Sequence, residues 1–308
     1  MMVSFRYLQR ACVPAAFAVV GLGGLAVACG QGAAPGRSTL FDDGDSGAGG
    51  GPASGDGGSD GAEPIFTDAG VGPQGDAGDG CPESAKLVYV TGVGNQLWSF
   101  KPPSTFKLIG TMNCLASPTH MTVDRQGSAW VVSSGLLYKA STVDATCAQV
   151  PTWKPNGNFS DFSLTFVGNS NSPDPSLYIL NDFAGLARFD TVAGSVSAIG
   201  NVSVAQTLGD MTSNGDGTLY YLNDVFNPVL YNFSPSSAAT IKSYAIAANG
   251  GGAQALAFWG GSFYAFENSV IYQFDPKQST TTKLGSAPLT VTGAGQSTCV
   301  PQVAPPPG

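Results

Sequence analysis

The sequence predicts an all-β fold over residues 81–300: a β-propeller of five four-stranded blades. Short runs of alternating apolar residues are separated by clusters of Gly, Pro, Asn and Asp, with no helical period. Aromatic anchors recur about every 41 to 48 residues, a spacing typical of one blade. The last repeat is cut short after its first run. About 220 residues at this period give five blades.

Each repeat contains recognisable runs in a fixed order. The first run ends in a glycine turn, as in MTVDRQG from Met121 and MTSNGDG from Met211. The second run carries the aromatic anchors, which are Tyr89, Trp130, Tyr178, Tyr220 and Tyr264. A third run follows after a short loop, as in VIYQF, and a more variable fourth run closes the unit. A β-sandwich would explain the short strands but not the period, so it is the weaker alternative.

The first repeat lacks its first run, because KLVYV and QLWSF occupy the second and third places. The segment PLTVTGAG, residues 288–295, is predicted to supply that strand, so both chain ends build blade one and the ring has no free edge. This closure places Cys299 beside Cys81 and predicts a disulfide between them, which leaves Cys114 to pair with Cys147. A zinc site is the alternative, but the chain has one histidine and no C-x-x-C spacing.

Residues 1–29 have the pattern of an export signal. Two arginines precede an apolar stretch that is interrupted by glycine and is short for a membrane span. The stretch ends in LAVAC, which resembles the lipobox of bacterial lipoproteins. That resemblance implies a lipid-modified Cys29 and a protein anchored at the cell envelope, at the outer membrane or cell surface. The alternative is an ordinary secretory signal cut near Ala28, which would give a secreted protein.

Residues 30–80 are dominated by Gly, Asp, Ser, Ala and Pro, a composition that predicts a disordered tether. Much of the net charge of −8 lies in this segment. The acidic balance argues against a nucleic-acid partner, and we expect contact with the membrane only through the lipid. Residues 301–308 form a proline-rich tail. We expect a monomer.

The candidate site lies on one face of the predicted propeller. Loops that enter the innermost strands share this face with loops that join the second and third strands of each blade. His120 and Asp210 occupy the first kind of loop. The second strands end in the pairs Asn181-Asp182, Asn223-Asp224 and Glu267-Asn268.

Oxygen-rich side chains that converge at a channel mouth would suit calcium. The predicted metal ligands are Asp182, Asp210, Asp224 and Glu267. The predicted binding residues are His120, Asn181, Phe183, Asn223, Phe226 and Asn268. Here the two phenylalanines would stack on a sugar ring or on a partner's side chain. The alternative for both is a hydrophobic plug between blades. The alternative for each Asn-Asp pair is strand-end capping of the backbone, and for His120 a hydrogen-bonded channel residue.

No nucleophile elbow, second histidine or phosphate loop is present in the sequence. The runs FDTVAGSVSAIG and QFDPKQSTTTKLG resemble third-to-fourth strand hairpins of the superfamily that includes YncE-like and NHL-type surface propellers and metal-centred lactonases. Lactonases of this group usually have six blades and a Glu, Asn and Asp channel set that does not match here. Streptogramin-lyase-type propellers need more histidine. The tether followed by a propeller is also similar to lipoproteins of myxobacteria.

The sequence therefore favours a non-catalytic, lipid-anchored envelope module that binds a protein or a glycan. The alternative is a calcium-dependent hydrolase of lactonase or phosphoesterase type, in which the channel carboxylates hold the metal. The enzyme question stays open at this level.

Overall fold

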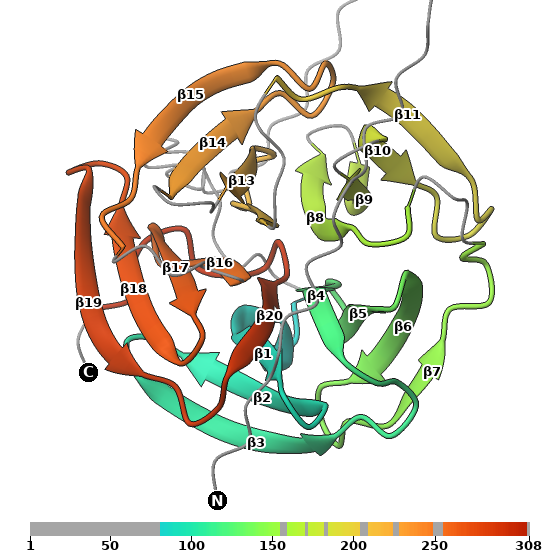
Figure 1. Cartoon of the computed structure of the whole chain (residues 1–308), viewed down its shortest axis with the longest axis horizontal. Coiled ribbons are helices and arrows are strands. Elements are labelled where there is room, and N and C mark those ends of the chain that lie inside the picture. Colours follow the sequence, from blue (N-terminus) through green and yellow to red (C-terminus); the bar gives the residue numbers. More distant parts are fainter. Residues whose placement is uncertain are drawn as a thin grey trace, which may run out of the picture. The chain divides into compact units, whose positions relative to one another are not determined.

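The computed structural model describes residues 81–154, 159–169, 172–181, 184–203, 209–223, 228–248 and 255–306. These residues form five four-stranded antiparallel sheets arranged as blades around a central axis (Figure 1). The predicted five-bladed propeller is confirmed. No helix among the described residues is long and apolar enough to cross a membrane.

Each blade runs from an innermost strand to an outermost one. Blade one consists of β20 (Val291–Gln296), β1 (Val88–Gly92), β2 (Gln96–Lys101) and β3 (Thr105–Thr111). Blade two consists of β4 (Pro118–Val123), β5 (Ser128–Ser133), β6 (Leu136–Ser141) and β7 (Cys147–Gln149). Blade three consists of β8 (Ser163–Asn169), β9 (Ser172–Asn181), β10 (Gly185–Phe189) and β11 (Val196–Gly200).

The last two blades follow the same order. Blade four consists of β12 (Asp210–Ser213), β13 (Leu219–Asn223), β14 (Val229–Phe233) and β15 (Thr240–Ala245). Blade five consists of β16 (Ala255–Trp259), β17 (Ser262–Glu267), β18 (Val270–Asp275) and β19 (Thr280–Ser286). A short 3₁₀ helix, η1 (Glu83–Lys86), precedes β1.

The hydrophobic core lies between neighbouring blades rather than in one central mass. One cluster fills the space between blades one and two around Tyr89 and Met121. Another packs Trp153 against Phe162 and Phe189 in blade three. Because every blade packs on both sides, the second strands are buried almost throughout, which explains the repeated aromatic anchors in the sequence.

Blade one is closed by the end of the chain, as the sequence predicted. Strand β20 pairs antiparallel with β1, with Tyr89 opposite Gly295. A Cβ atom on Gly295 would lie 2.3 Å from the carbonyl oxygen of Met121 on β4. Glycine is therefore required here because the backbones of β20 and β4 lie in close contact.

The segments that flank the propeller, residues 81–87 and 297–306, lie together on the face opposite the predicted site, which we call the tail face. The Ser297 hydroxyl donates to the Ala85 carbonyl at 2.6 Å, and the Trp259 indole donates to the Lys86 carbonyl at 3.1 Å. Further along the tail, the amide of Gly260 donates to the Pro301 carbonyl at 2.7 Å. Both ends thus pack against blades one and five.

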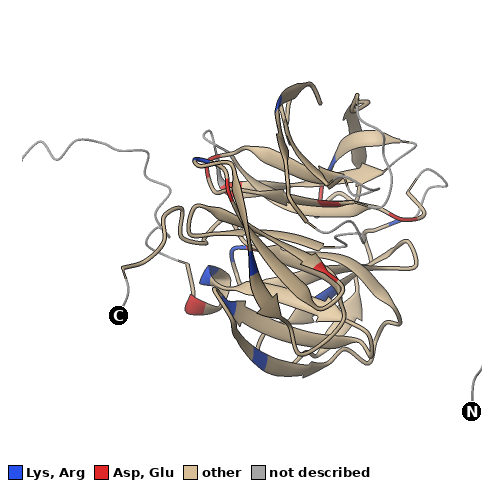
Figure 2. Cartoon of the chain, turned by 60° about the vertical axis from the view of Figure 1, so that its left-hand side comes forward, with Lys and Arg blue, Asp and Glu red and all other residues tan. Residues whose placement is uncertain are grey.

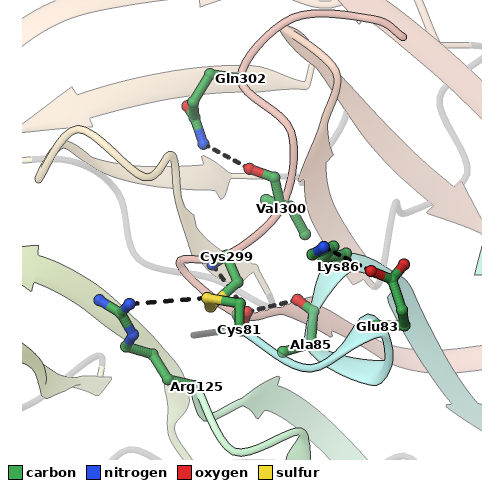
Figure 3. Close-up of a disulfide and its surroundings, with 9 residues drawn as sticks. Cys81, Glu83, Ala85, Lys86, Arg125, Cys299, Val300 and Gln302 are labelled. Carbon is green, nitrogen blue, oxygen red and sulfur yellow. Dashed lines mark hydrogen bonds and ion pairs between the residues drawn. A yellow bond between two sulfur atoms is a disulfide. The ribbon is translucent and has the colours of Figure 1, made fainter. Parts of the chain in front are cut away.

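Two disulfides hold the ring, with the pairing expected from the closure argument. Cys81 is joined to Cys299 across 218 residues, next to the tail-face contacts and within 3.7 Å of the Arg125 guanidinium (Figure 3). Cys114 is joined to Cys147, which ties the outer part of blade one to β7 of blade two.

Charged residues are sparse on the described propeller. Figure 2 shows Lys, Arg, Asp and Glu scattered along strands and loops, with most of the ribbon uncharged.

Candidate functional site: the channel mouth

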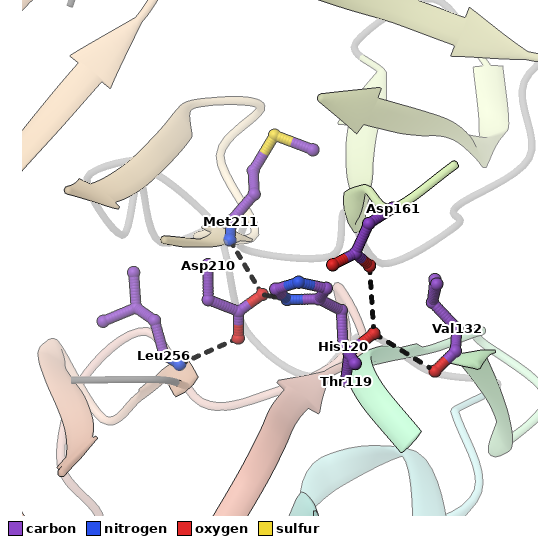
Figure 4. Close-up of polar contacts among 7 residues, drawn as sticks. All are labelled: Thr119, His120, Val132, Asp161, Asp210, Met211 and Leu256. Atoms are coloured by element: carbon purple, nitrogen blue, oxygen red, sulfur yellow. Dashed lines mark hydrogen bonds and ion pairs between the residues drawn. The ribbon is translucent and has the colours of Figure 1, made fainter. Parts of the chain in front are cut away.

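The channel mouth is the inner part of the face opposite the tail face, where the innermost strands begin. Here His120 of β4 meets Asp210 of β12 across the axis, with Nδ1 at 3.0 Å from Oδ1 (Figure 4). Asp210 is wholly buried, whereas the His120 side chain is 14% exposed. The sequence placed these two residues in equivalent slots of blades two and four, and the structure brings them together.

The Asp210 carboxylate is bonded to three blades. It accepts hydrogen bonds from the amide of Met211 on its own strand and from the amide of Leu256 on β16, at 3.0 and 2.9 Å. Which of His120 Nδ1 and Asp210 Oδ1 carries the hydrogen between them depends on the tautomer of the imidazole. Burial raises the pKa of Asp210, and the hydrogen bond and charge of His120 act in the opposite direction.

A second polar group lies beside this pair. The Thr119 hydroxyl donates to Asp161 Oδ1 at 3.3 Å, and Asp161 itself lies in the segment that leads into β8 (Figure 4). The Asn181 amide donates to the Asp161 carbonyl, and the Ala184 amide donates to Asn181 Oδ1 at 3.1 Å. Asn181 thus has the strand-end capping role that was the alternative for the Asn-Asp pairs.

Below the channel mouth, side chains form hydrogen bonds with backbone groups along the unpaired edges of the innermost strands. Gln296 of β20 accepts from the Phe258 amide of β16 at 3.1 Å and donates to the Ser213 carbonyl of β12 at 2.7 Å. On the other side, the Thr122 hydroxyl of β4 donates to the Gln296 carbonyl at 3.2 Å. The Phe166 amide of β8 lies 3.4 Å from the same hydroxyl. These contacts link all five innermost strands.

A role for Gln296 was not predicted from the sequence, although a recurring polar position in the first runs of the repeats indicates one. Thr122, Thr165 and Thr212 hold the same place in three of the first runs, and all are about 1% exposed. A polar residue that recurs inside an otherwise apolar strand indicates a bonded interior position. Gln296 follows the two glycines of the last run and interrupts the same apolar pattern.

Of the other predicted site residues, some belong to the described part of the structure and some lie outside it. Asn223 is buried at the end of β13, and Asn268 accepts from the Val291 amide through its carbonyl. Glu267 Oε2 is buried and has no hydrogen bond from the described residues. Asp182, Phe183, Asp224 and Phe226 lie outside the described residues.

The predicted calcium site stays a prediction. Among the described residues, no group of three or more His, Cys, Asp and Glu side chains is placed to hold a metal ion. Two of the four predicted ligands, Asp182 and Asp224, lie outside that part of the chain. A third, Asp210, has both oxygens engaged by protein donors.

Comparison with known proteins assigns no family to the chain. No protein-family model matches the chain, and no curated protein matches it. A solved structure described as "The de novo evolutionary emergence of a symmetrical protein is shaped by folding constraints" is similar at 15% identity and a TM-score of 0.47. The alignment covers 70% of this chain and 99% of that one.

A second solved structure is the "Crystal structure of Nidogen/Laminin Complex", with 11% identity and a TM-score of 0.46. The alignment covers 68% of this chain and 80% of that one. At these identities the likeness concerns the fold alone. The sheet order of the chain itself shows that it is a five-bladed β-propeller.

Proposed function

We propose that this chain is a lipid-anchored module of the bacterial cell envelope, of the kind represented by YncE-like and NHL-type propellers. In this proposal the propeller binds a protein or glycan ligand without catalysing a reaction. One observation carries the choice of binding face: the two described segments that flank the propeller pack on the tail face, through Ser297, Trp259 and Gly260. The opposite, channel-mouth face is built from loops, the part of a propeller that most often carries function.

The chemistry of the described mouth suits a ligand of low charge. The Asn95 side chain donates to the Leu115 carbonyl and accepts from the Ser117 amide. Hydrogen bonds of a side-chain amide therefore hold the β1–β2 loop to the loop that precedes β4. Val93, on the same face, is 68% exposed. Amide side chains together with an exposed apolar group are typical of adaptable contacts to proteins or sugars.

Anchoring has its own test. The Cys29→Ser variant should move from the membrane fraction to the soluble fraction of the producing cell and lose incorporation of labelled fatty acid. Cys12→Ser, a change in the same export segment, is the matched control and should remain in the membrane fraction. Equal partition of the two variants would contradict the lipid anchor and leave an ordinary secretory signal.

Ligand binding is tested on the full-length Cys29→Ser protein. Fluorescently labelled protein is titrated onto isolated outer membranes and onto peptidoglycan, and bound protein is measured. We expect saturable binding to one of them, and competition by unlabelled protein. Binding that does not saturate on either fraction would overturn the proposal.

A calcium-dependent hydrolase is the second candidate, favoured by the His120–Asp210 bond at 3.0 Å. A buried carboxylate that orients an imidazole is an arrangement used in general-base catalysis. Calcium should then raise the thermal unfolding temperature, and Asp182→Ala with Asp224→Ala should abolish the rise. Turnover of a lactone or phosphoester would have to disappear in His120→Gln. If calcium raises the unfolding temperature but no lactone or phosphoester is turned over, the ion has a structural role only and the hydrolase is contradicted.

A further inference from the structure

The C-terminal tail reaches the hairpin that joins the two inner strands of blade four, on the tail face. After β20 the tail bonds first to blade one and then to blade five. Gln302 extends further, and its Oε1 accepts from the amide of Gly215, in the turn between β12 and β13, at 3.2 Å. One side chain of the tail thus holds a backbone amide that is 87 residues away in sequence.

Gln302 lies in close contact with Gly215. A Cβ atom on Gly215 would lie 2.5 Å from Gln302 Nε2 and 3.0 Å from the carbonyl oxygen of Thr298. Because glycine has no side chain, the tail can approach the turn this closely. The Gln302 side chain is also fixed within the tail, since its Nε2 donates to the Val300 carbonyl at 3.0 Å (Figure 3).

The same turn contains a reactive dipeptide. In Asn-Gly, the backbone nitrogen of the glycine can attack the side-chain carbonyl carbon of the asparagine and form a five-membered succinimide ring, because glycine has no Cβ to hinder the approach. The chain has three such dipeptides, which begin at Asn156, Asn214 and Asn249. Asn156 and Asn249 lie outside the described residues, whereas Asn214 belongs to the β12–β13 turn.

Two hydrogen bonds oppose this reaction at Asn214. Ring closure requires the Gly215 nitrogen to lose its proton, and that N–H is donated to Gln302. Ring closure also requires Asn214 Cγ to approach the nitrogen, whereas Asn214 Oδ1 accepts from the Thr218 amide at 3.2 Å, across the turn. The Thr218 bond is internal to the hairpin, so the tail supplies the restraint that can be removed separately.

We propose that Asn214 is a deamidation site that Gln302 of the tail holds unreactive. In the reaction, a bond forms between the Gly215 nitrogen and Asn214 Cγ, and the bond from Cγ to Nδ2 breaks. Nδ2 leaves as ammonia, together with the proton released by the Gly215 amide. Water then opens the ring at either carbonyl and gives aspartate or isoaspartate, so water is the only co-reactant and no oxidant is needed. The inference does not depend on which ligand the mouth face binds.

The products would change the blade-four hairpin in two ways. Either product adds a carboxylate close to Asp216, whose side chain already accepts from the Thr218 amide and hydroxyl. Isoaspartate also lengthens the backbone of the turn by a methylene group. Loss of the tail contact would therefore be followed by a permanent change of charge at the tail face.

The test uses the full-length Cys29→Ser protein, with and without Gln302→Ala, incubated in mildly alkaline buffer. Mass spectrometry of its peptides measures the conversion of amide to carboxylate at each Asn-Gly dipeptide. We expect Gln302→Ala to speed deamidation at Asn214 by about tenfold, the effect of one hydrogen bond. Val303→Ala, a change to the next tail residue, is the matched control and should keep the rate of the Cys29→Ser protein.

Asn156 and Asn249 are controls within the same molecules, and their rates should be equal in all variants. Equal rates at Asn214 with and without Gln302 would overturn the proposal. An acceleration at all three dipeptides would also overturn it, because the fold would then have loosened as a whole. If Gln302→Ala does not fold, the Cys29→Ser protein is compared in buffer and in guanidinium chloride. Asn214 should then react about tenfold faster or more in the denatured protein, and equal rates would contradict the proposal.

Discussion

The side-chain amide of Gln296, on the last strand of the chain, donates to the Ser213 carbonyl of blade four at 2.7 Å. The two residues are 83 positions apart in sequence and lie on innermost strands that do not pair with each other. Gln296 also accepts from the Phe258 amide of blade five. A single side chain thus satisfies backbone groups of two blades from a strand that belongs to a third.

Replacement of Gln296 by Ala should destabilise the propeller by about 3 kcal/mol, because it leaves the Phe258 amide and the Ser213 carbonyl buried and unpaired. Urea unfolding measures the change. Gln273→Ala removes a part-buried bond to Ser262 on blade five and should cost at most about 1 kcal/mol. Equal losses in the two variants would show that Gln296 has no special role at the axis.

Gly295→Ala should destabilise the protein by about 2 kcal/mol or more, because its Cβ would overlap the Met121 carbonyl on β4. Gly200→Ala is the matched control, since its Cβ would meet its nearest atom at 3.3 Å at the outer edge of blade three. Thermal unfolding of both variants tests the contact. Unfolding of Gly295→Ala at the wild-type temperature would contradict the requirement for glycine between β20 and β4.

The two disulfides should contribute unequally to stability. Cys81–Cys299 closes a loop of 218 residues and Cys114–Cys147 a loop of 33. Chain-entropy arguments give about 5 and about 3.5 kcal/mol for loops of these sizes. The Cys81→Ser, Cys299→Ser double variant should therefore unfold at lower urea than the Cys114→Ser, Cys147→Ser variant. The reverse order would contradict closure as the main stabilising link.

Alkaline unfolding should begin above pH 10, as the hydroxyl groups of buried tyrosines ionise. Burial raises the pKa of Tyr264 to about 12, so the folded state keeps a proton that the unfolded chain loses near pH 10. Stability from this group is present below pH 10 and is lost as the pH rises through about 12. Tyr264→Phe should shift the alkaline transition to higher pH, measured by circular dichroism together with tyrosinate absorbance. An unchanged transition would place the sensitive group elsewhere.

Most of the fold could be predicted from the sequence because a propeller repeats its pattern. The anchors at Tyr89, Trp130 and Tyr178 set the period, and the unfinished run before Cys299 set the closure. Both follow from local periodicity and from the need to leave no free sheet edge. The disulfide pairing followed from topology, which no spacing rule alone provides.

The site was predictable only in part. His120 and Asp210 occupy equivalent slots, so their shared face was visible in the sequence, but their bond across the axis depends on the ring geometry. The role of Asn181 depends on the Asp161 carbonyl, a backbone group that sequence patterns do not reveal. Gln296 was missed because its partners lie on strands of other blades, far away along the chain.

The central proposal is that the channel-mouth face, rather than the tail face, binds an envelope partner. Two exposed valines on opposite faces test it: Val93 in the β1–β2 loop of the mouth face, and Val192 in the β10–β11 hairpin on the tail-face side, 68% and 87% exposed. A photo-crosslinking amino acid is introduced at each position in the anchored protein in its own cells. We predict a discrete, saturable adduct from position 93 and none from position 192. Adducts from position 192 alone, or equally from both, would contradict the proposal.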